Sequence, residues 1–358
     1  MSIHFHTLII KEVRRETPEA VSIVFDIPDH LRDSFQFIQG QNIAIRAMIG
    51  GEECRRNYSI CSAPGEKEFR IAVKQIEGGL FSTYANQVLK AGDSLEVMSP
   101  SGRFFTPLDP SAQRQYVAFA AGSGITPLMS IMKTTLAQEP GSTFTLVYGN
   151  RSRQHIMFRE ALEDLKNRYL HRFQLMHVLS REETDSPIQT GRIDADKCRL
   201  IGERLVPYGN VYAFFVCGPE AMINTIEACL QDAGVDPARI HTERFHSGAS
   251  RTVAQAATAA QAAGQQAEIK VLHDGLVTRF SLAYDGASIL DAALRQGVDL
   301  PFACKGGMCC TCRAKLVEGK VDMDRNYALE PDEVNAGFIL TCQSHPRTTA
   351  VTVDYDVR

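Results

Sequence analysis

Residues 301–312 read PFACKGGMCCTC, and one more cysteine follows after 29 intervening residues. The spacing is therefore Cys-x4-Cys-x2-Cys with a distant fourth cysteine, which is the ligand pattern of a plant-type [2Fe–2S] cluster. Two adjacent glycines inside the loop give it the backbone freedom that a close approach to a cluster requires. The predicted metal ligands are Cys304, Cys309, Cys312 and Cys342.

Two other cysteine chemistries explain this pattern less completely. A zinc site needs a second close pair of ligands, whereas Cys342 stands alone. A thioredoxin-like Cys-x-x-Cys formed by Cys309 and Cys312 leaves Cys304 and Cys342 without a role. Cys310 lies at a position that the cluster pattern does not use, so we interpret it as a small buried residue.

Length and composition set broader limits. The chain has 358 residues, enough for two or three domains, and a hydrophobic fraction of 44%, which suits soluble globular domains. A formal net charge of −4 gives no sign of the excess positive charge typical of nucleic-acid-binding proteins. No apolar run reaches the length of a membrane span. The first residues do not resemble a signal peptide. Because the cysteines outside the cluster pattern are scattered, we expect a reducing, cytoplasmic location.

Residues 1–108 predict an antiparallel β-barrel. Residues 7–13, 20–25 and 42–47 have the composition of strands, and glycine-containing turns punctuate the segment. Short, closely spaced strands with little helix are typical of such a barrel.

One predicted strand carries RRNYSI at residues 55–60, which resembles the Arg-x-Tyr-Ser flavin motif of the ferredoxin–NADP reductase family. The residue types suit that chemistry, because an arginine offers paired donors to a pyrophosphate. By resemblance, the Tyr58 ring lies against the isoalloxazine and the Ser59 hydroxyl donates to flavin N5. Arg55 is interpreted as a solvated strand residue. The flavin site that the resemblance implies comprises Arg56, Tyr58, Ser59, Ile60, Val73, Lys74, Gly79, Leu80, Phe81 and Ser82.

The last four of these residues form a glycine-to-serine turn before a predicted helix at residues 83–90. In the flavin interpretation, the N–H groups at the start of this helix hold phosphate. In the alternative interpretation, Ser82 is an ordinary N-cap.

Residues 109–245 predict a dinucleotide-binding α/β domain. An apolar strand at 115–121 runs into GSGITP at 122–127 and then into a helix at about 127–137. A buried strand, a glycine turn and a helix form a nucleotide-binding start, and the turn matches the reductase family's Gly-x-Gly-x-x-Pro form. Further alternation predicts a parallel sheet with helices on both faces, with strands at 144–148, 173–179 and 211–216 and helices at 156–168 and 221–233.

The fourth predicted strand ends in Cys217-Gly218-Pro219, which resembles the family's Cys-Gly-Pro motif beside the nicotinamide. A lone cysteine is usually a small buried hydrophobe, but its place at the carboxyl end of a strand favours the functional interpretation. The nucleotide site implied by the resemblance comprises Gly122, Gly124, Thr126, Pro127, Arg151, Ser180, Arg181, Cys217, Gly218 and Pro219.

Two further features bear on the chemistry of this domain. Ser180 and Arg181 resemble the NADP site of plant-type reductases and favour NADPH, although Glu182 could favour NAD and Arg181 could be a solvated loop residue. By resemblance, Glu243 lies beside the flavin and assists proton movement. The alternative is a solvated carboxylate at a strand edge.

The remainder forms a linker and a third domain. Residues 246–267 are rich in alanine and glutamine and cannot build a core, so they predict a tether. Residues 268–358 have candidate strands at 268–272, 277–283, 312–317, 320–323, 338–341 and 350–355 and a candidate helix at 288–296. Their resemblance to ferredoxins implies an α+β, β-grasp domain around the cluster loop.

The order of the three blocks resembles reductase components of aromatic-ring oxygenases. That resemblance implies an NADPH-dependent oxidoreductase that carries FAD and a [2Fe–2S] cluster, with a multi-subunit, di-iron oxygenase as the electron acceptor. Ser59, Cys217 and Glu243 are the implied catalytic residues. A reductase for another acceptor (a Rieske oxygenase, a steroid hydroxylase or a hybrid-cluster protein) and a redox-sensing interaction protein remain open alternatives.

Overall fold

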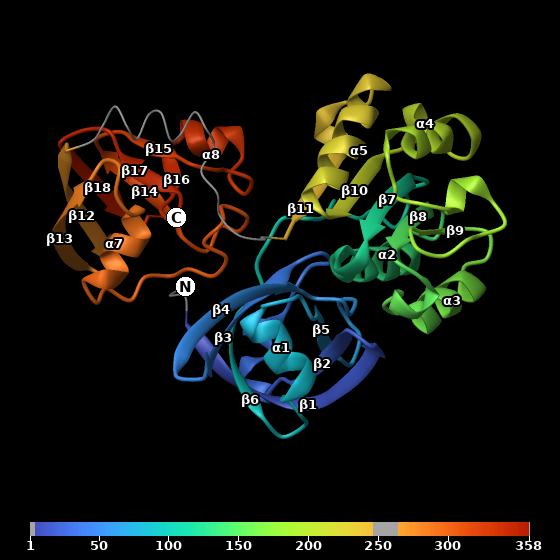
Figure 1. The fold of residues 1–358 in the computed structure, drawn as a ribbon, viewed down its shortest axis with the longest axis horizontal. Helices are drawn as coiled ribbons and strands as arrows, with labels where there is room; N and C mark the ends of the chain where they lie inside the picture. Colours follow the sequence, from blue (N-terminus) through green and yellow to red (C-terminus); the bar gives the residue numbers. More distant parts are fainter. Residues whose placement is uncertain (1–3, 246–263, 358) are drawn as a thin grey trace. The chain divides into compact units, whose positions relative to one another are not determined.

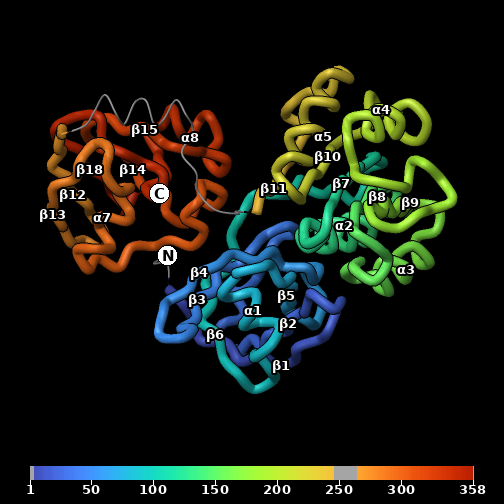
Figure 2. The backbone as a smooth tube through the Cα atoms, in the orientation of Figure 1, coloured from blue at the N-terminus to red at the C-terminus, as the bar shows by residue number. Residues whose placement is uncertain are grey.

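The computed structural model describes residues 4–245 and 264–357, and it divides them into two compact units (Figures 1 and 2). The first unit spans His4–Phe245, and the second contains the described residues from 264 onward. The expected linker, residues 246–267, lies mostly outside the described residues. Its last two residues belong to a strand, because β12 begins at Gln266. Within the described ranges, no helix is long and apolar enough to cross a membrane.

The first unit begins with a six-stranded antiparallel sheet in the order β4-β3-β6-β1-β2-β5. Its strands are β1 (Phe5–Thr17), β2 (Ala20–Asp26), β3 (Asn42–Ile49), β4 (Glu52–Ser59), β5 (Phe69–Lys74) and β6 (Ser94–Met98). An isolated bridge between Ile60 and Ile71 joins the two outer strands and closes the sheet into a barrel. Apolar side chains that alternate along these strands form one core, which includes Leu8, Ile23, Ile45 and Val73.

Two expectations for the barrel are wrong. The helix predicted at 83–90 is α1 (Leu80–Gln87), which begins three residues earlier, so Ser82 lies inside its first turn and is not the N-cap. Arg55 is buried rather than solvated. Its Nε donates to Glu53 Oε1 at 2.8 Å, and its guanidinium lies 5.2 Å from the centre of the Phe5 ring.

The rest of the first unit is a five-stranded parallel sheet in the order β11-β10-β7-β8-β9. Its elements are β7 (Gln115–Ala121), α2 (Ile125–Gln138), β8 (Thr143–Asn150), α3 (Arg159–Arg168), β9 (Phe173–Leu179), α4 (Ala195–Arg204), β10 (Ala213–Gly218), α5 (Glu220–Asp232) and β11 (Ile240–Arg244). Helices α2 and α3 share a core with one face of the sheet, and α4 and α5 share a core with the other (Figure 1). The predicted parallel sheet with helices on both faces is confirmed.

Local backbone geometry explains where the helix predicted at 156–168 differs from the structure. Phe158 adopts the left-handed conformation (φ 58°), which a helix cannot continue through, so α3 begins only at Arg159. The sequence pattern does not predict α4 or the edge strand β11.

The second unit is a mixed five-stranded sheet in the order β13-β12-β18-β14-β16, with a two-stranded ribbon of β15 and β17. Its elements are β12 (Gln266–His273), β13 (Leu276–Ala283), α7 (Ile289–Arg295), β14 (Arg313–Glu318), β15 (Val321–Met323), α8 (Pro331–Asn335), β16 (Phe338–Leu340), β17 (Ser344–Pro346) and β18 (Ala350–Asp354). Helix α7 packs onto the sheet through Ile289, Leu290 and Ala293. The expected α+β plan is confirmed, and the short strand β15 pairs with β17.

Candidate functional site

The predicted flavin motif lies where the barrel meets the nucleotide-binding domain. Ser59, the last residue of β4, is buried, and its hydroxyl donates to Glu243 Oε2 at 2.9 Å. The Tyr58 and Phe81 rings lie 5.3 Å apart between centroids, so β4 and the first turn of α1 form one aromatic surface. Burial raises the pKa of Tyr58, which therefore stays neutral. Arg56 is exposed on the same strand and donates to the Arg55 carbonyl.

The start of α1 offers unpaired backbone donors. Gly79 precedes the helix, and a side chain there would meet Ser82 Oγ at 2.3 Å and Ile76 Cγ1 at 2.5 Å. Ser82 Oγ accepts from the Ile76 N–H and donates to the Gly79 carbonyl, both at 3.2 Å. The turn is thereby fixed, and the first N–H groups of the helix have no intrahelical partner, as an anion site requires.

Glu243 comes from β11 and is placed by strand pairing. Its Cα partner on β10 is Cys217, so the two predicted catalytic side chains are neighbours across the parallel pair. The residue as a whole is half-buried, but its carboxyl group is enclosed. Burial raises the pKa of Glu243 to about 7, against the opposing effect of hydrogen bonds from Ser59 and Asn42. Glu243 is thus a half-buried residue whose carboxyl group can gain or lose a proton near neutral pH.

Cys217 is fully buried, and burial raises the pKa of its thiol well above the ordinary value, with the Glu243 charge acting in the same direction. The thiol is therefore neutral. Ser59, Cys217 and Glu243 form one cluster, although they come from three strands in two parts of the unit.

The glycine turn after β7 shows why these residue types are needed. A Cβ on Gly124 would lie 2.0 Å from the Cys217 carbonyl oxygen, so only glycine lets the turn pack against the end of β10. Thr126 Oγ1 donates to the Ser123 carbonyl at 3.0 Å, and Thr126 and Pro127 are buried in the first turn of α2. Tyr148, which the sequence pattern does not single out, donates to the Gly122 carbonyl at 2.9 Å.

Lys74 connects the barrel to this turn. Its Nζ lies 3.6 Å from the position that a Cβ on Gly122 would occupy, so a cation of β5 lies directly over the glycine turn. Glu19, in the turn between β1 and β2, lies 4.0 Å from Lys74 Nζ, 3.4 Å from the Arg151 guanidinium and 4.0 Å from His155 Nε2. One carboxylate of the barrel therefore gathers cations beside the nucleotide turn.

The residues predicted to select the nicotinamide cofactor follow β9. Ser180 and Arg181 are exposed, and the Arg181 N–H donates to the Arg151 carbonyl at 2.8 Å, so β8 and β9 bring these two arginines together by their backbones. Glu182 is engaged elsewhere. Its carboxylate accepts from the Arg153 N–H at 2.8 Å and lies 3.0 Å from Arg153 Nε.

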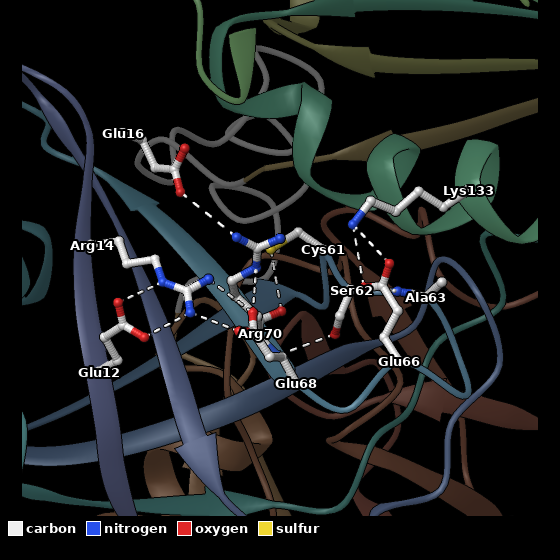
Figure 3. A network of polar contacts seen from close by, with 10 residues as sticks. All are labelled: Glu12, Arg14, Glu16, Cys61, Ser62, Ala63, Glu66, Glu68, Arg70 and Lys133. Atoms are coloured by element: carbon white, nitrogen blue, oxygen red, sulfur yellow. Dashed lines mark hydrogen bonds and ion pairs between the residues drawn. The ribbon is translucent and has the colours of Figure 1, made fainter. Parts of the chain in front are cut away.

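A polar network lines the same junction (Figure 3). Lys133 of α2 donates to Glu66 of the barrel at 3.0 Å, and Glu66 also accepts from the Ala63 N–H. Arg70 approaches the Phe158 ring at 5.7 Å. Apolar residues of both parts, such as Ala72 of the barrel and those of α2, belong to one core. These contacts hold the flavin motif and the nucleotide turn in one compact unit.

In the second unit, the four predicted ligands converge. Cys304 Sγ and Cys309 Sγ lie 3.2 Å apart, and contact with Cys304 lowers the pKa of Cys309. Cys312 and Cys342 form the other pair, in which the contact with Cys312 lowers the pKa of Cys342. Cys310 is half-buried, and its thiol donates to the Ala328 carbonyl at 3.2 Å, away from a ligand role.

The loop geometry depends on two unusual backbone conformations. Lys305 and Gly307 both have positive φ, 51° and 75°. A Cβ on Gly307 would meet the Arg325 carbonyl oxygen at 2.8 Å, which explains the glycine. The Gly306 N–H donates to Cys304 Sγ at 3.3 Å. Four thiols and inward backbone donors form a donor set that fits a [2Fe–2S] cluster.

Three segments of the chain match families of known proteins. Residues 8–105 match an oxidoreductase FAD-binding domain, residues 119–228 an oxidoreductase NAD-binding domain, and residues 273–347 a 2Fe-2S iron-sulfur cluster binding domain. The solved structure of phthalate dioxygenase reductase shares the fold, with a TM-score of 0.60 at 24% identity over 98% of both chains.

Full-length relatives extend the match. Residues 55–61, 76–79, 148–151, 288–297 and 304–307 resemble the reductase subunit of ring-1,2-phenylacetyl-CoA epoxidase. A subunit of 1,2-phenylacetyl-CoA epoxidase from Escherichia coli (strain K12) is 46% identical over 99% of this chain and 98% of its own, which confirms the resemblance. The ferredoxin reductase component of 3-ketosteroid-9-alpha-monooxygenase from Rhodococcus rhodochrous is 33% identical over 97% of this chain and 96% of its own. The chain therefore belongs to the family of modular oxygenase reductases, oxidoreductases that join an FAD-binding domain, an NAD-binding domain and a 2Fe-2S domain in one polypeptide.

Proposed function

We propose that this protein passes electrons from NADPH to the oxygenase that epoxidises phenylacetyl-CoA, a multi-subunit di-iron enzyme. The identity to the Escherichia coli epoxidase subunit over nearly the full length of both chains supports this partner. The reductase role is supported mainly by the cluster of Ser59, Cys217 and Glu243. These residues come from β4, β10 and β11 and lie together where the barrel meets the parallel sheet.

The domain limits follow the same assignment. We propose an FAD-binding barrel at residues 1–108, an NADP-binding domain at 109–245, a tether at 246–267 and a ferredoxin domain at 268–358. Since the cluster ligands must remain reduced thiolates, we also propose a cytoplasmic location.

Within the flavin site, Arg56 and the N-terminal turn of α1 at residues 79–82 hold the pyrophosphate. Tyr58 and Phe81 provide the aromatic surface, Val73 and Ile60 the apolar floor, and Ser59 a hydroxyl donor. FAD held by these residues would supply the chemistry that accepts a hydride and releases single electrons. Glu243, whose carboxyl group has a pKa of about 7, accepts a hydrogen bond from Ser59 Oγ at 2.9 Å and would be the group that takes up or releases a proton beside the flavin.

In the nucleotide site, the turn of Gly122 and Gly124 lets the pyrophosphate approach the start of α2, and Lys74 lies over that turn. Cys217-Gly218-Pro219 bounds the nicotinamide pocket, with a neutral thiol that does not repel a hydride donor. Arg181 is exposed and, within the described part of the chain, has no ion-pair partner, whereas Glu182 is held by Arg153. This arrangement favours a 2′-phosphate over a 2′-hydroxyl and hence NADPH.

The test is an anaerobic titration of the reconstituted protein with NADPH, followed by turnover assays with candidate oxygenases. We expect the flavin absorbance to bleach first and the cluster bands next, and the phenylacetyl-CoA epoxidase to turn over when mixed with the reduced protein. Bleaching of the flavin alone would contradict internal transfer. Bleaching with no turnover by any oxygenase would instead support a redox-sensing role.

A second acceptor has a specific observation in its favour. The 33% identity to the reductase component of a 3-ketosteroid-9-alpha-monooxygenase also extends over almost the whole chain. If the reduced protein supports turnover of a steroid hydroxylase but not of the epoxidase, the steroid hydroxylase is the electron acceptor.

A further inference from the structure

Gln343, the residue after Cys342, has a side chain for which the ligand pattern gives no reason. It is 6% exposed, and its amide nitrogen donates to two carbonyl oxygens, those of Lys305 and Cys342, each at 2.9 Å. The same nitrogen lies 3.6 Å from Cys342 Sγ. The side chain therefore joins the loop that carries three ligands to the segment that carries the fourth.

The backbone around Gln343 fixes this orientation. The Gln343 N–H donates to the Leu340 carbonyl at 2.9 Å, and the Gln343 carbonyl accepts from the Asp324 N–H at 2.8 Å. A Cβ on Gly307 would lie 3.3 Å from Gln343 Cγ, so the cluster loop packs directly on the glutamine stem. Because the amide nitrogen is bonded to two backbone carbonyls, it has little freedom to turn away from the sulfur.

Reduction adds negative charge to a cluster and its thiolates. An N–H directed at a ligand sulfur interacts more strongly with the reduced state, so it raises the reduction potential. At 3.6 Å, the distance from the Gln343 nitrogen to Cys342 Sγ is within the reach of an N–H to sulfur hydrogen bond.

We propose that Gln343 is a positioning residue that raises the reduction potential of the iron–sulfur cluster. It does so by placing its NH2 group, the positive end of the amide dipole, 3.6 Å from Cys342 Sγ, while its bonds to the Lys305 and Cys342 carbonyls hold that group in place. This inference rests on the proposed assignment of the four cysteines as cluster ligands.

The test compares the full-length, FAD- and cluster-loaded protein with its Gln343→Leu variant in redox titrations followed by EPR. Leucine keeps much of the volume but has no N–H. At a fixed solution potential we expect the ratio of reduced to oxidised cluster to fall about tenfold, which is 59 mV for a one-electron couple. Gln343→Glu, which keeps the shape, loses the donors and adds charge, should shift the potential in the same direction and further.

Thr341 provides the matched control. It is buried beside Cys342, and its hydroxyl donates to the Cys312 carbonyl at 2.9 Å rather than to a ligand sulfur. Thr341→Val should therefore lower stability and leave the potential close to that of the parent protein. Equal shifts in the Thr341 and Gln343 variants would mean that the effect comes from loosened packing, and would overturn the proposal.

A third measurement needs no variant that could fail to fold. Pulsed EPR of the reduced parent protein, labelled with ¹⁵N in the glutamine side chain, should show a nitrogen weakly coupled to the cluster. Lack of that coupling, or Gln343 variants with full iron content and an unchanged potential, would refute the role of Gln343. Lack of any iron–sulfur signal in the parent protein would instead refute the cluster assignment itself.

Discussion

Replacement of Glu243 by glutamine should make the stability of the first unit less dependent on pH. The pKa of this carboxyl group rises from 4.5 to about 7, mainly because burial disfavours the ionised form. One pKa unit is worth about 1.4 kcal/mol, so the folded state carries a cost of about 3 kcal/mol once the group is ionised.

The sign follows from proton binding. Between pH 4.5 and 7 the folded state binds more protons at Glu243 than the unfolded state does, so stability falls as the pH rises and levels off above pH 7. Integrated from pH 5.5 to pH 8.5, this effect lowers the free energy of unfolding by about 2 kcal/mol. Glu243→Gln removes that loss, and any constant effect of the new amide cancels when the two pH values are compared.

The assay is urea unfolding of the full chain at both pH values, with the release of flavin fluorescence marking the transition of the first unit. Infrared spectroscopy of the carboxyl C=O stretch gives the protonated fraction independently. Glu203→Gln serves as the control, because Glu203 is an exposed residue of α4. If the wild-type protein and Glu243→Gln lose the same stability between the two pH values, Glu243 is already ionised at the lower one and the reasoning fails.

Three further changes test the sites separately. Gly124→Ala places a methyl group 2.0 Å from the Cys217 carbonyl oxygen, so it should lower the free energy of unfolding by about 1–3 kcal/mol and weaken dinucleotide binding. Gly209→Ala is the control, because a Cβ there meets open space. It should change neither quantity in melting and binding assays. Arg181→Ala should raise the KM for NADPH at least tenfold more than the KM for NADH; an equal effect on both would favour NADH as the physiological donor. Cys342→Ser should abolish the EPR signal of the cluster, and Cys310→Ser should retain it with unchanged iron content.

The sequence predicted those parts of the fold in which one stretch of chain contains the whole signal. The apolar strand 115–121 and the strand 173–179 agree with β7 and β9 residue for residue, because each is a short apolar-rich run flanked by polar residues or glycine. Helix α4 was missed because its buried face includes only Cys198 and Ile201 within an otherwise polar segment. Arg55 was misjudged because Phe5, which covers it, comes from a strand fifty residues away.

The same distinction separates the two redox sites. Three cluster ligands lie within nine residues, so their spacing alone reveals the loop, and the structure adds only the contact of Gln343 with the fourth ligand. Ser59 and Glu243 are 184 residues apart and meet only because β4 ends where β11 pairs with β10. No spacing rule can reveal that contact, since it depends on how a barrel and a parallel sheet share one core. The proposed flavin site is therefore a property of the tertiary structure, whereas the proposed cluster site is mainly a property of one loop.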